Sequence, residues 1–460
     1  MEWRITMKNI TNQITCGYII FCALYSISTR FMPTAILCEG PVADILYKTV
    51  IIGGGILALL FLFLLKDALK PGISLFLLTG FIVILGISTL LNHKYEFVGN
   101  ILGMATFVSQ LIIFYCLPQL MPKKQIVRCV KLTAVFTSLF WSIGCTASLY
   151  QYVKNIHYTT PSPENHRIRQ GIVDGRLFGL FSDPNFAAFT SLLVILLLVY
   201  TLRHTQIKLL KIYSIICIAI NLCYLIMSNS RTIYIAAVGT ILFAVVLSTY
   251  NHCKSEEGVE LRRFIILSCR RVLITLVGII ALYSLIFFPL REIGRILESE
   301  RSVNDMVRKD VTTDNLTNNR STIWKNYLTL YKDKPVFGFS IRSALPYATD
   351  KYPNSYLAKT QYVTHNGYLS LLVETGFTGF AVMGAFFVLI FIQALKKIRQ
   401  KEKVSETYIF FATLTVSVLI FLMCFHDVFF TVNIETMLLF IAIGYIDKSN
   451  QSISSISARH

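Results

Sequence analysis

The residues best suited to chemistry in this chain form a short polar sequence, 364–369, directly before the apolar segment 371–379. This sequence contains His365 and Asn366 side by side. Because the pKa of an imidazole lies near neutrality, a histidine at such a place can serve as a general base. A lone histidine is more often structural than catalytic, so the competing interpretation is a loop that ends where a helix begins.

The composition indicates which elements must position these residues. Of the 460 residues, 54% are hydrophobic and 15% are charged, whereas soluble domains carry about 25% charged residues. Apolar segments of bilayer-spanning length recur along the chain, and such runs are helical because lipid offers the backbone no other partner. We therefore predict an all-α, polytopic integral membrane protein with about 12 transmembrane helices, at 14–29, 47–65, 73–91, 98–117, 130–150, 186–202, 209–227, 232–249, 272–289, 368–393, 407–425 and 430–446.

Lysine and arginine residues are concentrated in alternate connections between these segments, for example in 123–131 and 396–403. The positive-inside rule assigns these connections to the cytoplasm, and with them the N- and C-termini of a multi-pass protein of the bacterial cytoplasmic membrane. The net charge of +18 would suggest a nucleic-acid partner in a soluble protein. Here its placement follows the membrane topology, so no nucleic acid is expected.

This topology divides the chain into three regions. They are 1–289, with helices 1–9 and an external loop at about 151–185; 290–367, a large external loop between helices 9 and 10; and 368–460, with helices 10–12 and a cytoplasmic tail. Because the large loop is rich in aromatic residues, we expect it to be partly helical. A helix is predicted over 321–331, with one face formed by Trp324, Tyr327, Leu328 and Tyr331.

Arginines on the predicted external side could bind an anion. Arg231 places a cation at a helix N-terminus, where the macrodipole disfavours it unless an anion binds there. The alternative is an interfacial arginine that extends to lipid headgroups. Arg320 precedes the predicted helix 321–331 and is the second candidate. Weaker candidates in this loop are Arg291, Arg295, Arg301 and Arg342.

A further polar sequence precedes the sixth predicted span. Asp183 followed by proline is typical of a helix N-cap, which explains 182–184 structurally. Arg176 and Asn185 have no capping role and remain candidates for binding.

An acidic residue lies inside a predicted membrane helix. Glu374 is about two turns into the tenth span, where a carboxylate should face the protein interior or a water-filled cavity. Helical spacing would place His365, Tyr368 and Leu369 on one face of the same helix.

Metal and disulfide chemistry are not predicted. The eleven cysteines lie mainly in apolar segments, and no pair has the spacing of a zinc site. No Asp-x-Asp sequence occurs on the external side. We expect no metal, no cofactor and no structural disulfide.

In this arrangement the chain resembles the O-antigen ligase/polymerase superfamily of bacterial envelope glycosyltransferases. The matching sequences occur in the family's order: Gly-Leu-Phe-Ser-Asp-Pro-Asn at 179–185, Ser-Asn-Ser-Arg at 228–231, Arg-Ser-Thr-Ile-Trp at 320–324 with Pro335 and Gly338 after it, and His-Asn-Gly-Tyr-Leu at 365–369 followed by Glu-Thr-Gly at 374–376. Each sequence is short, but together, at these topological positions, they are fairly specific.

The resemblance implies transfer of saccharide from a polyprenyl-diphosphate carrier at the outer face of the cytoplasmic membrane. His365 would be the catalytic base, and the substrate-binding residues would be Arg231, Arg320, Arg176, Asn366, Asn185 and Glu374. Guanidinium groups suit a diphosphate leaving group without a metal, so we expect metal-independent, inverting transfer. Expected partners are the lipid-linked oligosaccharide and membrane lipid, with a chain-length regulator and a flippase of the same pathway.

Four functions remain open at this point. Polymerisation of lipid-linked repeat units is favoured over ligation of glycan to lipid A-core or to protein, because nothing in the sequence indicates a lipid A-core acceptor. A lipid-linked saccharide flippase should have several charged spans and short external loops. A non-catalytic assembly scaffold would not need His365.

Overall fold

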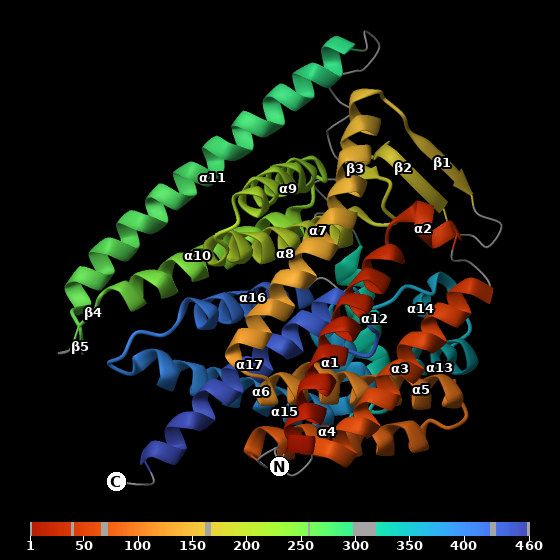
Figure 1. The fold of residues 1–460 in the computed structure, drawn as a ribbon. Helices are drawn as coiled ribbons and strands as arrows, with labels where there is room; N and C mark the ends of the chain where they lie inside the picture. The colour runs from red at the N-terminus through yellow and green to blue at the C-terminus, as the bar shows by residue number, and fades with distance from the viewer. Residues whose placement is uncertain are drawn as a thin grey trace.

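The structure is a computed structural model, and it describes residues 2–37, 41–65, 72–161, 167–255, 258–297, 319–423 and 429–457. Long helices form its body (Figure 1). They are α1 (Glu2–Ser28), α3 (Pro41–Leu65), α4 (Ile73–Leu91), α5 (Phe97–Gln110) continued by the π-helix η2 (Leu111–Cys116) and α6 (Leu117–Leu120), α7 (Lys123–Val153), α8 (Pro184–His204), α9 (Lys208–Met227), α10 (Arg231–His252), α11 (Leu261–Leu297), α15 (Gly367–Arg399), α16 (Glu406–Leu422) and α17 (Ile434–Ser457). Shorter helices are α2 (Met32–Leu37), α12 (Arg320–Tyr331), α13 (Ala344–Lys351) and α14 (Tyr356–Thr360).

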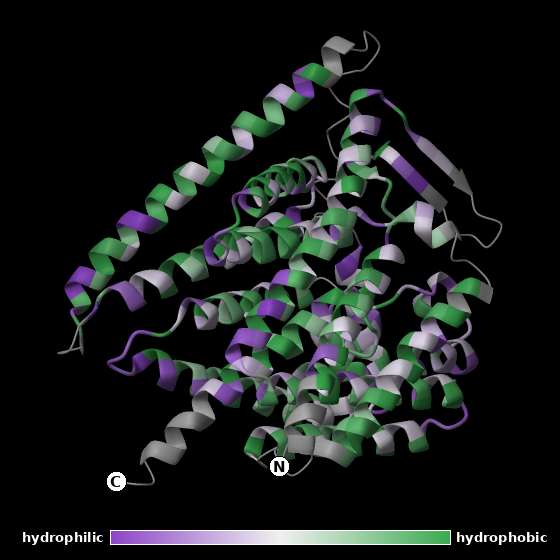
Figure 2. Cartoon of the chain, in the orientation of Figure 1, coloured by the Kyte–Doolittle hydropathy of each residue, from purple (hydrophilic) through white to green (hydrophobic). Residues whose placement is uncertain are grey.

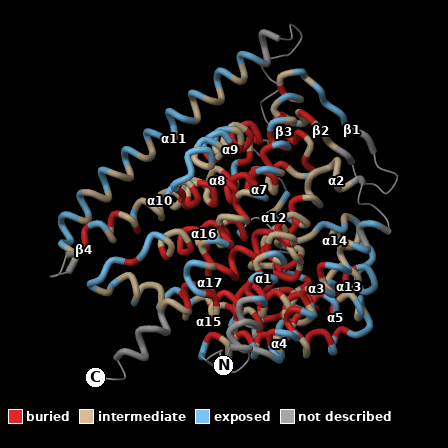
Figure 3. The backbone as a smooth tube through the Cα atoms, viewed as in Figure 1, coloured by how far each residue is buried: buried red, intermediate tan, exposed pale blue. Residues whose placement is uncertain are grey.

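Each predicted span coincides with one of these helices, so the all-α membrane fold is confirmed. Within the described residues, 10 helices are long and apolar enough to cross a membrane, and α16 is a shorter apolar helix. Apolar residues predominate along the helices in Figure 2. The long helix α11 runs along the edge of the bundle with most of its surface uncovered (Figure 3). An apolar helix exposed in this way is typical of a lipid-facing span.

The predicted loop 151–185 contains a small sheet that was not predicted. Strands β1 (Tyr158–Pro161), β2 (Arg167–Val173) and β3 (Arg176–Gly179) pair antiparallel in that order. Asp174 and Gly175 connect β2 to β3, and both have positive φ, +53° and +69°. Asp-Gly is a strong sequence signal for such a two-residue hairpin turn.

The polar elements lie at two opposite ends of the bundle. In Figure 1 the sheet β1–β3, α2, α13 and α14 lie at the right, whereas the hairpin of β4 (Lys254–Ser255) and β5 (Gly258–Val259) lies at the lower left. The described candidate residues lie mainly in connections or at helix starts, whereas Glu374 lies inside α15.

The helix predicted over 321–331 is present as α12, but its packed face differs from the prediction. The side chains it buries are Ile323, Tyr327 and Leu330, whereas Leu328 is 46% exposed. The prediction of the face was wrong for Leu328 because the loop packs over only one narrow side of α12.

Candidate functional site

His365 lies in a turn that precedes α15, outside the helix. We call residues 364–366 the histidine turn. Its histidine has a φ of +48°, and α15 begins at Gly367. The prediction that His365 shares a helical face with Tyr368 and Leu369 is therefore wrong, because a left-handed residue does not continue a right-handed helix. Asn366 is the N-cap: its Oδ1 accepts from the backbone N–H groups of Tyr368 and Leu369, each at 3.0 Å.

The histidine turn is fixed against α12. Trp324 Nε1 donates to the carbonyl oxygen of Thr364 at 2.9 Å, and the hydroxyl of Tyr327 donates to the carbonyl oxygen of Tyr362 at 2.9 Å. Burial raises the pKa of Tyr327, so the phenol keeps the proton that it donates. Arg320, the first residue of α12, lies one helical turn before Trp324. The family-like sequence at 320–324 and the histidine turn are thus joined by a hydrogen bond.

The other two predicted sequences also meet, in a group that we call the arginine cluster: Arg176, Asn185, Ser230 and Arg231. Asn185 Oδ1 accepts from Arg176 Nη2 at 2.5 Å and from Ser230 Oγ at 2.7 Å. Arg176 is buried, and its Nε donates to the carbonyl oxygen of Ser228 at 3.4 Å. Arg231 is exposed and, within the described part of the chain, has no hydrogen-bonding or ionic partner. Asn185 and Arg176 therefore hold the cluster together by hydrogen bonds. The guanidinium of Arg231 is exposed to solvent and can bind a ligand.

Helix α16 contacts residues that neighbour the histidine turn and the arginine cluster. The hydroxyl of Tyr368, just after the turn, donates to the carbonyl oxygen of Leu419 at 2.8 Å. Two residues further along α16, the ring of Phe421 lies 5.9 Å from that of Phe186, which follows Asn185 in α8. Residues next to each of the two groups thus contact the same end of α16.

The predicted helix start before α8 is confirmed. Asp183 Oδ1 accepts from the backbone N–H groups of Asn185 and Phe186 at 2.7 and 3.0 Å, and Pro184 is the first helical residue. This N-cap fixes Asn185 at the point where it accepts from two neighbouring elements.

An ion pair that the sequence analysis did not predict lies beside this helix start. Both oxygens of the Glu435 carboxylate accept from Arg30, at 2.5 and 2.8 Å. The guanidinium of Arg30 also lies over the ring of Phe186, 4.5 Å from its centroid, and donates to Thr190 Oγ1 at 3.2 Å. The backbone carbonyl of Arg30 accepts from Ser182 N at 3.0 Å. The Arg30–Glu435 pair therefore links the segment after α1 and the start of α17 to the N-terminal part of α8.

Helix α15 is broken at Gly376, and the loop 335–340 docks into the break. Gly376 has φ +66° and ψ −174°, and Gly338 in the loop has φ +68°. Backbone hydrogen bonds join the two segments: Phe339 N to Val373 O, Ser340 N to Glu374 O, Phe377 N to Pro335 O and Thr378 N to Val336 O. A Cβ on either glycine would overlap backbone atoms of the other segment. The glycines of the matching family sequences thus serve a close backbone contact.

Replacing Gly376 with alanine is expected to destabilise the protein by about 1–3 kcal/mol through its left-handed backbone alone. The added Cβ would also lie 2.2 Å from the carbonyl oxygen of Val336. Gly384→Ala is the matched control, because it lies in the same helix and its Cβ would meet nothing within 4 Å. Thermal unfolding of the purified variants in detergent should show a lower midpoint for Gly376→Ala only. Equal midpoints would contradict a close backbone contact between Gly376 and the loop 335–340.

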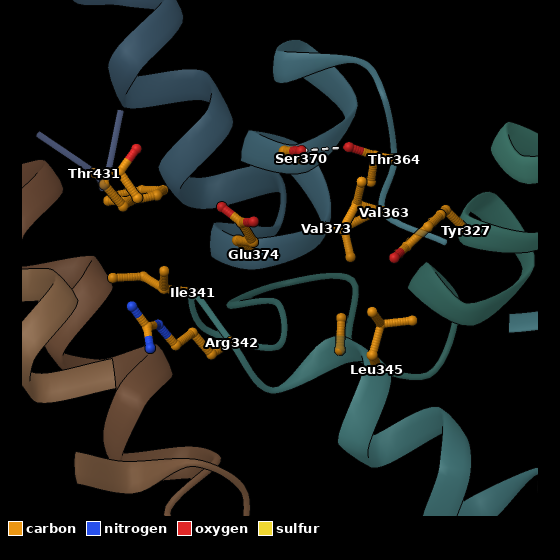
Figure 4. A pocket seen from close by; sticks show the side chains of 12 residues that line it. Tyr327, Ile341, Arg342, Leu345, Val363, Thr364, Ser370, Val373, Glu374 and Thr431 are labelled. Carbon is orange, nitrogen blue, oxygen red and sulfur yellow. Dashed lines mark hydrogen bonds between the residues drawn. The ribbon is translucent and has the colours of Figure 1, made fainter. Parts of the chain in front are cut away.

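A cavity of about 200 Å³ lies directly beside the histidine turn (Figure 4). Its polar lining comes from the turn, from α15 and from two loops: Thr364, Ser370, Glu374, Arg342 and Thr431. Thr364 Oγ1 and Ser370 Oγ are 2.5 Å apart and form a hydrogen bond. Glu374 thus faces a cavity, as its position in the tenth span predicts. Arg342, one of the weaker candidates, lines the same cavity, whereas the side chains of Arg295 and Arg301 lie outside the described residues.

These features define a multi-pass membrane protein whose candidate histidine and arginines lie at helix starts and in connections, with Glu374 and Arg342 in the wall of one cavity. Residues 216–384 match the O-antigen ligase family, and this match supports membership of the O-antigen ligase/polymerase superfamily. The matched region contains Arg231, Arg320, His365 and Glu374, while Arg176 lies before it. Comparison with curated proteins found no match.

The family match also gives the class of function. Members are glycosyltransferase-like enzymes that act on lipid-linked saccharides, and the match over 216–384 indicates an O-antigen ligase/polymerase-type function.

Proposed function

We propose that the protein polymerises lipid-linked oligosaccharide repeat units into surface polysaccharide at the outer face of the cytoplasmic membrane, with both termini in the cytoplasm. The observation that carries the proposal is the packing of the histidine turn against α12, which places His365 near the helix that begins with Arg320. The exposed Arg231 supports it, because a guanidinium at a helix N-terminus is suited to phosphate.

The proposed step is a single displacement. His365 removes the proton of an acceptor hydroxyl as this oxygen attacks the anomeric carbon of the donor sugar. The bond from that carbon to the diphosphate oxygen breaks, and polyprenyl diphosphate leaves with the bonding electrons. Arg231 and Arg320 stabilise the negative charge that develops on the leaving group. Attack opposite the leaving group inverts the anomeric configuration.

Arg231→Ala is expected to lower polymer formation roughly ten- to hundred-fold, because a hydrogen bond to a charged group contributes about 1.5–3 kcal/mol. Arg231→Lys should give an intermediate activity, since an ammonium keeps the charge but cannot form the bidentate hydrogen bonds of a guanidinium. The measurement is electrophoresis of surface polysaccharide from deletion cells that express each variant. Arg262→Ala is the control, an exposed arginine in the first turn of α11. Full-length chains with Arg231→Ala would overturn the role of Arg231.

Transfer by the purified protein is expected to continue in excess chelator. The guanidinium groups take the place that a divalent cation would otherwise occupy at the diphosphate. Incorporation of lipid-linked repeat units into longer chains should be measured with and without chelator. Activity that is lost and then restored by magnesium would contradict a metal-independent mechanism.

Ligation to lipid A-core or to protein is the second function consistent with the family match. The complementation experiment separates the two. Loss of a polymerase leaves single repeat units on the final acceptor, whereas loss of a ligase leaves long chains on the lipid carrier. A flippase is not favoured, because few charges lie within the predicted spans and one predicted external loop is long. Loss of a flippase would leave unpolymerised carrier-linked units on the cytoplasmic side, which the same experiment can detect.

A further inference from the structure

We infer that the cavity beside the histidine turn is the acceptor subsite and binds one uncharged sugar ring of the acceptor saccharide. The inference rests on the proposed function and deepens it, because it names the group whose hydroxyl His365 deprotonates. Thr364 lines this cavity and is the residue directly before His365 in the turn.

The polar lining of the cavity matches the functional groups of a sugar. Glu374 supplies a carboxylate that accepts from sugar hydroxyls, and Arg342 supplies a guanidinium that donates to them. Figure 4 shows both groups at the wall of the same space, with the hydroxyl side chains of Thr364 and Ser370 above them. The backbone N–H of Arg342 donates to Asn100 Oδ1 at 2.8 Å, which fixes this loop to α5.

The charges of the lining decide which part of the substrate binds here. Arg342 is the only cation and Glu374 the only carboxylate among the residues that line the cavity in the described part of the chain. A doubly charged diphosphate would be repelled by Glu374 and attracted by a single arginine. An uncharged sugar ring can use both groups. The diphosphate is better served by Arg231, which has no acidic partner in the described residues.

The size and the apolar lining agree with a single ring. Pockets for drug-sized ligands measure about 300–1,000 Å³, so a cavity of about 200 Å³ holds one ring-sized group. The side chains of Leu345, Val363 and Phe430 form an apolar part of the wall, against which the C–H face of a sugar can pack. The adjoining sugars of the acceptor would extend out of the cavity.

The test measures binding of the repeat-unit saccharide itself, released by mild acid from the lipid-linked unit that deletion cells accumulate. This probe has lost its diphosphate and therefore cannot bind as donor. Saturation-transfer NMR with the full-length protein in nanodiscs reports binding without requiring activity. We expect Glu374→Gln to weaken binding roughly ten-fold or more, because a charged acceptor is lost at an unchanged shape.

A second variant fills the cavity. Ala344→Leu adds volume at the lining, while Ala358→Leu adds the same volume to a half-buried alanine of the neighbouring helix α14, away from the lining. Binding should be lost in Ala344→Leu and retained in Ala358→Leu. Unchanged binding in both Glu374→Gln and Ala344→Leu, or no binding to the wild type at millimolar saccharide, would overturn the subsite.

Failure of this inference can be told apart from failure of the proposed function. If cells that lack the protein still form polymer, the proposed function is wrong whatever binds in the cavity; if His365→Ala alone still forms polymer, the role of His365 as base is wrong. If His365→Ala forms no polymer but Glu374→Gln and Ala344→Leu bind the saccharide like the wild type, only the subsite is wrong.

Discussion

Cells in which His365 is replaced by alanine are expected to make no long-chain polysaccharide, although the protein accumulates normally. A positioned general base contributes about 10²–10⁴-fold to a rate, and the acceptor hydroxyl has no other proposed base. The residue lies outside α15, so its replacement removes no helical hydrogen bond. His365→Asn provides a second variant, because asparagine tolerates the left-handed backbone of this position, φ +48°, but cannot act as a base.

The measurement is the rate at which purified protein lengthens lipid-linked repeat units, together with electrophoresis of the polysaccharide from complemented cells. His157→Ala is the matched control, since His157 is an exposed histidine next to the sheet β1–β3 at the same end of the bundle. Both His365 variants should be inactive and His157→Ala fully active. Wild-type chain lengths from His365→Asn would show that the histidine is structural.

The helices could be predicted from the sequence because lipid forces every backbone group in a span to bond within its own helix. Hydropathy alone therefore located α4, α8, α9, α10 and α16 to within three residues, whereas α1, α7, α11 and α17 extend well beyond the predicted spans. The same rule does not apply outside the bilayer. The sheet β1–β3 was missed although Asp174–Gly175 is a typical hairpin turn, since the strands beside it are short and lack a regular alternation of apolar and polar residues.

The candidate site was predicted as a set of residues, and the structure shows which of them are joined. Arg176 and Asn185 could be identified as unexplained by capping, but only the structure shows that they bond to each other. Asn366 was assigned to the substrate, and the structure places its Oδ1 in the N-cap of α15. Its Nδ2 is the part that could still contact a sugar. Contacts of this kind depend on packing between distant segments and have no local sequence signal.

The Arg30–Glu435 pair is the clearest residue pair that sequence reasoning missed. The two residues are separated by nearly the whole chain. Each nevertheless lies at a predicted external helix end, where an isolated charge is costly. Two opposite charges at similar depth are a signal that could have indicated the pair.

Glu435→Ala is expected to destabilise the protein by about 3–5 kcal/mol, the largest effect on stability that we predict. The side chain of Glu435 is 1% exposed and that of Arg30 is 13% exposed. Removing the carboxylate would leave a guanidinium buried without its counter-charge. The free energy of unfolding in detergent, or the thermal midpoint, measures the effect.

The matched control is Asp350→Ala, which breaks an exposed ion pair with Lys94. Their side chains are 49% and 68% exposed, so this change should cost about 0–1 kcal/mol. Replacing both buried charges, as in Arg30→Met with Glu435→Leu, should recover most of the stability, because no unpaired charge remains. A double variant as unstable as Glu435→Ala would mean that packing, and not charge, dominates.

The same variants test whether the pair matters for the site. Arg30 contacts Phe186 and Thr190, and its carbonyl accepts from Ser182, so three contacts fix the N-terminal part of α8, which contains Asn185. The double variant should be stable, yet it lacks the guanidinium over Phe186. If that contact positions Asn185 and through it the arginine cluster, the double variant should be folded and slower at transfer. Wild-type transfer by a stable double variant would limit the role of Arg30 to folding.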